Sequence, residues 1–106
     1  MKYGLKEETI VGLQTIFSHF SEVEKAILYG SRAKGNFKPS SDIDITLKGD
    51  LLNLNILNQI EWELDDLLLP YTIDLSVFHF LNNEDLIDNV EKEGMVIYEK
   101  ARKLNI

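Results

Sequence analysis

The sequence of 106 residues contains no cysteine. Disulfides, cysteine-ligated zinc and thiol nucleophiles are therefore all excluded. The composition is compatible with a reducing compartment, and the first residues, which include Glu7 and Glu8, do not resemble a signal peptide. We therefore expect a cytoplasmic protein.

Positive charge is also scarce. The chain has 11 lysines and arginines against 18 aspartates and glutamates, for a formal net charge of -7. This balance argues against an extended nucleic-acid surface, which requires clustered cations. It does not exclude a nucleotide site, because a few local cations or bound metal ions are sufficient there.

Long apolar runs, internal repeats and linkers are absent as well. None of the apolar segments is long enough to span a bilayer, so we expect no membrane segment. The length and the ordinary globular composition predict a single domain over residues 1–106.

Hydrophobic periodicity predicts three helices. Apolar residues recur at helical spacing in residues 6–20, 51–69 and 84–94. Asn83 is predicted to cap the last helix, and Pro70 to end the second. The predicted buried stripe of the second helix comprises Leu54, Leu57, Ile60, Leu64, Leu67 and Leu68.

Strands are predicted between these helices, at residues 25–30, 41–49 and 71–78. Residues 95–100 are interpreted as either a last edge strand or an extended segment against the core, and residues 101–106 as a frayed end. The order helix, strand, turn, strand, helix, strand, helix predicts an α/β (α+β) fold with a mixed sheet packed with helices. The first two strands have no helical crossover between them, which favours an antiparallel pair.

Paired carboxylates are the first functional feature. Asp42 and Asp44 are two residues apart in a predicted strand, so they project from the same face, while Ile43 and Ile45 point into the core. Adjacent carboxylates on one face repel each other, and a divalent cation between them relieves the repulsion. Hard oxygen ligands of this kind suit Mg²⁺ or Mn²⁺.

The third predicted strand repeats the pattern with Asp74 among apolar neighbours. If this strand lies beside the second, Asp74 can reach the same site, and three carboxylates could hold two metal ions for in-line phosphoryl or nucleotidyl transfer. A solvated strand face is the alternative. Because aspartate is disfavoured in strands, its recurrence favours the metal site.

The turn-rich segment before Asp42 contains two glycines, Gly30 and Gly35, at the spacing of a P-loop. The P-loop prediction fails because Asn36 and Phe37 follow Gly35, where lysine and then serine or threonine are required. Another route to phosphate remains: Ser31 could open a short helical turn whose amides face an anion. A plain glycine turn with solvated cations is the alternative.

Taken together, the segment LYGSRAKGNFKPSSDIDITL resembles the DNA polymerase β-type nucleotidyltransferase superfamily, in which Gly-Ser, a turn and Asp-x-Asp follow one another. The Arg-Ala-Lys-Gly and Ser-Asp details and the small size resemble its minimal nucleotidyltransferase branch. That branch includes antitoxins of the MntA type, which are usually encoded beside a helical HEPN toxin. The resemblance covers essentially the whole chain.

This resemblance implies a Mg²⁺-dependent nucleotidyltransferase with two metal ions, Mn²⁺ being an alternative. It implies that Asp42, Asp44 and Asp74 are the metal ligands and catalytic residues, and that Gly30, Ser31, Lys34 and Ser41 bind the nucleotide. Arg32 is expected either to assist with phosphate or to pair with an acidic neighbour.

The implied reaction transfers a nucleoside monophosphate, AMP from ATP, to a hydroxyl on a HEPN-type partner, so that the protein acts as an antitoxin. The chain has no second domain to bind an acceptor, so a partner supplies that surface or is the acceptor. Two alternatives stay open: an antitoxin that neutralises its partner by contact alone, and an aminoglycoside-type small-molecule nucleotidyltransferase. The oligomeric state is also open.

Overall fold

The computed structural model describes residues 1–101, so most of the predicted frayed end lies outside the described residues. The predicted element order is confirmed, and the segment predicted at residues 95–100 forms a strand over Met95–Glu99. The elements are α1 (Glu7–Ser18), β1 (Lys25–Tyr29), α2 (Ser31–Lys34), β2 (Ile43–Lys48), α3 (Leu54–Asp65), β3 (Ile73–Val77), the 3-10 turn η1 (Phe78–Phe80), α4 (Glu84–Glu93) and β4 (Met95–Glu99).

The four strands form one mixed sheet in the order β3-β2-β1-β4. β1 runs antiparallel to both β2 and β4, whereas β2 and β3 are parallel. The predicted antiparallel pair across the turn-rich segment is therefore confirmed. The parallel pair requires a crossover, and α3 provides it.

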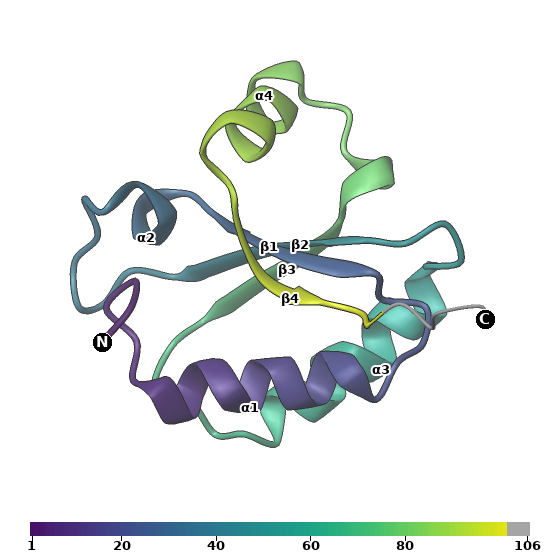
Figure 1. Cartoon of the computed structure of the whole chain (residues 1–106), viewed down its shortest axis with the longest axis horizontal. Coiled ribbons are helices and arrows are strands. Elements are labelled where there is room, and N and C mark those ends of the chain that lie inside the picture. Colours follow the sequence, from purple (N-terminus) through teal and green to yellow (C-terminus); the bar gives the residue numbers. More distant parts are fainter. Residues whose placement is uncertain (102–106) are drawn as a thin grey trace.

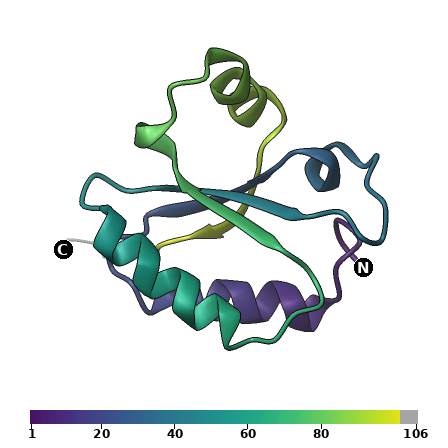
Figure 2. The same cartoon turned by 180° about the vertical axis from the view of Figure 1, so that it is seen from behind.

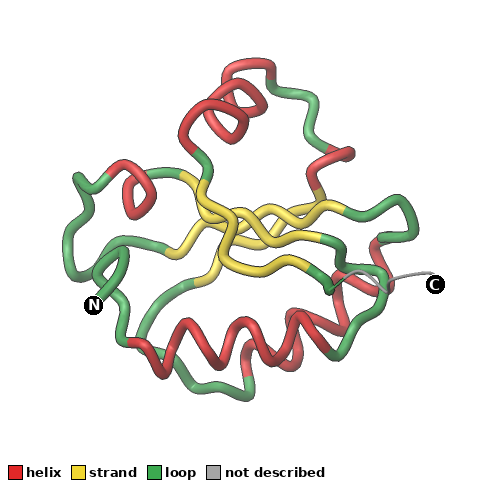
Figure 3. The backbone as a smooth tube through the Cα atoms, in the orientation of Figure 1, coloured by secondary structure: helices red, strands yellow, loops and turns green. Residues whose placement is uncertain are grey.

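Helices cover both faces of the sheet. α1 and α3 lie together against one face, and α4 stands over the other (Figure 1). The view from behind shows the same three layers (Figure 2). α2 lies at one end of the sheet, close to the N-terminus, where the loops are longest (Figure 3).

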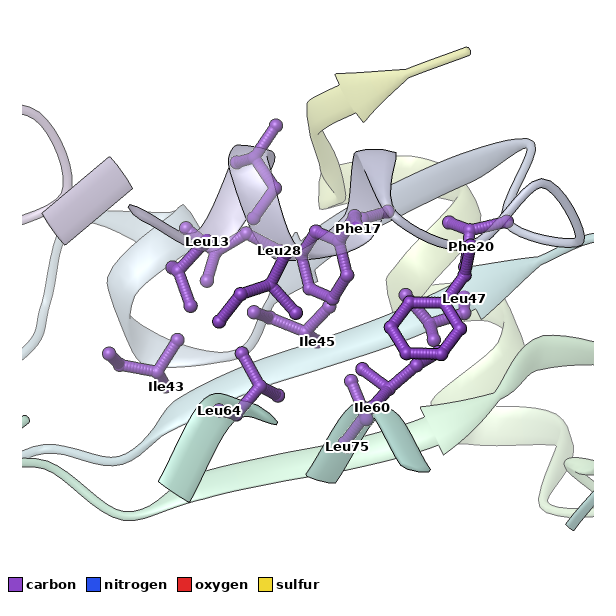
Figure 4. Close-up of a cluster of buried hydrophobic side chains, with 14 of the residues drawn as sticks. Leu13, Phe17, Phe20, Leu28, Ile43, Ile45, Leu47, Ile60, Leu64 and Leu75 are labelled. Atoms are coloured by element: carbon purple, nitrogen blue, oxygen red, sulfur yellow. The ribbon is translucent and has the colours of Figure 1, made fainter. Parts of the chain in front are cut away.

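The main core lies between the sheet and the α1–α3 layer (Figure 4). Ile43, Ile45 and Leu47 of β2 are fully buried there, as the strand alternation predicts. They pack with Leu13 and Phe17 of α1. Because these side chains face the helices, the alternate residues of β2 face the opposite side of the sheet.

The second helix differs from its prediction. α3 begins after Asn53, whose Oδ1 accepts a hydrogen bond from the Ile56 amide at 2.9 Å, and ends at Asp65, well before Pro70. The chain turns away from the direction of the helix before it reaches Pro70, at Leu68, whose backbone is left-handed with φ 51°. Leu68 is consequently 87% exposed, and Leu54, the first residue of α3, is 65% exposed, so the prediction that these two residues belong to the buried stripe is wrong.

The last helix begins as predicted. Asn83 caps α4, its Oδ1 accepting a hydrogen bond from the Leu86 amide at 3.1 Å. Within residues 1–101, no helix has the length and apolar character needed to cross a membrane.

Candidate functional site

Three aspartates gather at the end of the sheet beside α2. β1 ends where β2 and β3 begin, because β1 is antiparallel to β2 and β2 is parallel to β3. The register places Asp44 directly opposite Asp74, and Asp42 immediately precedes β2. The second and third strands are therefore adjacent, which is the condition for a shared site, and all three aspartates lie at the same end of the sheet.

These carboxylates repel one another. Burial, followed by the negative charges of Asp74 and then Asp42, raises the pKa of Asp44 above its ordinary value. Within residues 1–101, none of the three aspartates forms an ion pair. The cluster thus carries negative charge that no cation of the described residues pairs with.

The chemical nature of these carboxylate donors is suited to binding a divalent cation. The ligands are hard carboxylate oxygens, which suit Mg²⁺ and Mn²⁺. The three side chains do not converge on a single point: among residues 1–101, no three His, Asp or Glu side chains are arranged to hold a metal. Mg²⁺ is commonly held by one or two carboxylates together with substrate phosphates, and this cluster suits that mode of binding.

Gly30 lies directly against this cluster. Its backbone has φ 75° and ψ -155°, a conformation that only glycine adopts readily. A Cβ at this position would overlap Oδ2 of Asp44. Glycine is therefore required here for two reasons: it allows the turn from β1 into α2, and it allows the Asp44 carboxylate to approach the backbone closely.

The predicted helical turn after Gly30 is present as α2. Ser31 begins it, and hydrogen bonds from the Lys34 amide to the Gly30 carbonyl at 3.1 Å and from the Gly35 amide to the Ser31 carbonyl at 2.9 Å hold it. The amides at its start have no acceptor within the helix. Lys34 is exposed at its end.

Arg32 does not occupy either of its predicted environments. Its side chain is 1% exposed, so it is not a surface cation facing phosphate. Its hydrogen bonds go to the carbonyls of Ser41, Pro39 and Tyr3. Among residues 1–101 it has no carboxylate partner, so the prediction of an acidic neighbour is wrong.

The hydroxyl of Ser41 serves its own turn, since Oγ accepts a hydrogen bond from the Lys38 amide at 2.8 Å. The Ser41 amide in turn donates to the Lys38 carbonyl at 3.0 Å. These two bonds fix the chain just before Asp42. A contact between Ser41 and nucleotide stays a prediction.

Two residues that lie beside the aspartates were not predicted from the sequence. Tyr29 lies opposite Asp44 in the β1–β2 register, and Ser76 follows Asp74 on the same face of β3. Burial and then the charge of Asp74 raise the pKa of the Tyr29 hydroxyl, so it is protonated at neutral pH. The alternation of side chains along a strand would have predicted that Ser76 lies on the same face as Asp74. The position of Tyr29 beside Asp44 could be known only from the pairing of β1 with β2.

The family model described as Polymerase beta, Nucleotidyltransferase matches residues 12–103. No curated protein matches the chain.

Solved structures share the fold. A chain of a toxin-antitoxin complex with AMP-PNP is 23% identical, with a TM-score of 0.66 over 91% of this chain and 75% of that one. A chain of the MntA-HepT toxin-antitoxin complex is 16% identical, with a TM-score of 0.64 over 90% and 74%. A chain of the complex between the tri-AMPylated Shewanella oneidensis HEPN toxin and its MNT antitoxin is 18% identical, with a TM-score of 0.58 over 87% and 73%.

Proposed function

The chain belongs to the polymerase beta nucleotidyltransferase family, and on that premise we propose that it transfers AMP from ATP to a hydroxyl on a HEPN-type toxin, acting as its antitoxin. The observation that carries this proposal is the position of the aspartates. Asp44 lies opposite Asp74 and directly against Gly30, so the carboxylates and the phosphate-binding turn form one site.

The glycine turn would bind the triphosphate. The amides at the start of α2 and the Ser31 hydroxyl are donors for the β- and γ-phosphate oxygens. Lys34, exposed at the end of this turn, supplies a cation near the leaving group. Ser41 is a further predicted nucleotide contact.

Asp42, Asp44 and Asp74 would hold two Mg²⁺ ions, with Mn²⁺ as a substitute. When bound, the ions supply neutralisation of the phosphate charge and polarisation of the reacting phosphoryl group. Asp74 is the most exposed residue of β3, where an incoming hydroxyl can reach it, and in this proposal its carboxylate would accept the proton of that hydroxyl. The acceptor oxygen bonds to the α-phosphorus, the bond between that phosphorus and the bridging oxygen breaks, and pyrophosphate leaves.

The proposed acceptor is a tyrosine hydroxyl of the toxin. The structural neighbours support this choice, because they include a complex with a nucleotide analogue and one with a tri-AMPylated HEPN toxin. In this proposal the toxin itself supplies the surface that presents the hydroxyl. The proposed compartment is the cytoplasm.

Incubation of the protein with Mg²⁺, its purified HEPN partner and ATP labelled at the α-phosphate tests the proposal. Label is expected on the partner, and Asp42→Asn is expected to abolish it. ATP labelled at the γ-phosphate is expected to leave the partner unlabelled. Asp66→Asn, which changes an exposed aspartate beyond α3, is the matched control and is expected to transfer normally.

A tight complex with no label, unchanged by Asp42→Asn, would contradict enzymatic transfer and favour neutralisation by contact. Label found on an added aminoglycoside but never on the partner would favour a small-molecule acceptor instead.

A further inference from the structure

Arg32 is the one charged residue of the described chain that is fully buried. Burying a guanidinium costs several kcal/mol of hydration unless polar groups replace the water. Here the replacements are main-chain carbonyls, and every buried side-chain nitrogen or oxygen among residues 1–101 has a hydrogen-bond partner. An apolar side chain of similar size would fill the same space without this cost, so the presence of a guanidinium here requires another explanation.

The hydrogen bonds of Arg32 converge on the residue before Asp42. Nε and Nη2 both donate to the Ser41 carbonyl, at 3.1 and 2.8 Å. Nη2 also donates to Pro39 at 3.3 Å. The Ser41 carbonyl and the Asp42 amide belong to one planar peptide unit, so two hydrogen bonds to that oxygen orient the backbone that leads into Asp42.

Aromatic rings hold the guanidinium in place. The guanidinium carbon lies 4.8 Å from the Tyr71 ring centre and 5.3 Å from that of Phe37. Nη1 donates to the Tyr3 carbonyl at 2.9 Å, and a Cβ on the neighbouring Gly4 would overlap the Phe37 ring and lie 2.9 Å from Nη1. The side chain is thereby confined to one position.

From these contacts we propose that Arg32 is a positioning residue that fixes the distance between the two halves of the site. Its backbone follows Ser31 in the glycine turn, and its side chain holds the peptide before Asp42. One residue thus joins the phosphate-binding turn to the first carboxylate. This role rests on the proposed function, in which Asp42 is a metal ligand.

The test compares Arg32→Lys with Phe37→Leu. A lysine keeps the charge but lacks the planar fork, so it cannot make both hydrogen bonds to the Ser41 carbonyl together with those to Pro39 and Tyr3. Phe37→Leu removes one flanking ring and leaves the guanidinium hydrogen bonds. Both variants lose packing or stability in the same cluster, but only the first releases the peptide before Asp42.

Two readouts are measured, together with the melting temperature. Arg32→Lys is expected to weaken Mn²⁺ binding about tenfold, because a charged hydrogen bond is lost. Binding is measured by the paramagnetic relaxation that Mn²⁺ causes. Arg32→Lys is also expected to speed hydrogen exchange at the Ser41 amide by about tenfold, since the turn opens locally. Phe37→Leu is expected to leave both within about twofold, because the hydrogen bonds of the guanidinium to the Ser41 carbonyl and its contact with the Tyr71 ring remain.

Equal changes in the two variants at equal loss of stability would overturn the proposal, as would an Arg32→Lys protein with unchanged Ser41 exchange. If the unsubstituted protein neither binds Mn²⁺ nor transfers AMP, the proposed function fails, while hydrogen exchange still decides whether Arg32 holds the peptide. Should Arg32→Lys not fold, Arg32→Met keeps a long side chain without the buried charge or the guanidinium hydrogen bonds, and it is expected to speed Ser41 exchange.

Discussion

Replacing Gly30 by alanine tests whether the close approach of the turn to Asp44 matters for activity. The alanine Cβ would overlap Oδ2 of Asp44, so the carboxylate must move by about 1 Å to restore an ordinary van der Waals separation. Misplacement of a reacting group by about 1 Å is expected to lower the rate of AMP transfer roughly 10²-fold. The backbone strain costs a further ~1–3 kcal/mol of folding stability.

Gly35→Ala provides the matched control. Gly35 also has a positive φ, of 90°, but a Cβ there would meet no atom within 4 Å. It lies at the other end of the same short helix in the left-handed αL region, so alanine there is strained, though less than at Gly30, and does not contact Asp44. We expect it to lower the melting temperature by roughly 4–8 °C for each kcal/mol lost and to keep most of the transfer activity.

The assay is the initial rate of label transfer from ATP to the HEPN partner, measured well below the melting temperature of each variant. If only Gly30→Ala loses activity strongly, the close contact with Asp44 explains why glycine is required at position 30. Equal losses of activity in the two variants at equal fractions folded would refute this reasoning, because strain alone would then account for both.

Two further predictions concern stability. Without divalent metal, Asp44→Asn is expected to unfold at higher urea than the unsubstituted protein at neutral pH, because the folded state raises the pKa of Asp44 and so disfavours its charge. This advantage is expected to shrink as the pH falls through the raised pKa and to vanish below the ordinary value of 3.8, where the carboxyl is neutral in both states; an advantage that grows on acidification would contradict it. Asn53→Ala is expected to cost about 1 kcal/mol in denaturant unfolding through loss of the α3 cap. Asn58→Ala, within the exposed part of that helix, is the control, and a similar loss there would argue against the cap.

Local patterns predicted much of the fold. The alternation in β2 correctly separated Ile43 and Ile45, which are fully buried, from Asp44 on the opposite face. The cap at Asn83 was also predicted, because its hydrogen bond is made within one turn of the chain. Such features depend on neighbours in sequence, which is why sequence alone reveals them.

The end of α3 shows where local patterns fail. Pro70 forbids a helix through its own position, but the helix can stop earlier at any residue where another conformation packs better. Leu68 turns the backbone before Pro70, and its side chain then points to solvent. Hydrophobic spacing cannot distinguish this outcome from a longer helix.

By itself, the sequence determined the chemical types at the site: carboxylates at alternating strand positions and glycines in the preceding turn. The tertiary structure decided what these residues meet. The pairing of β2 with β3 sets Asp74 opposite Asp44, and the folding of the N-terminal turn and Pro39 segment around Arg32 turns a cation that looked exposed into a buried one. Strand pairing and side-chain burial depend on residues distant in the chain, and spacing within one segment does not specify those partners.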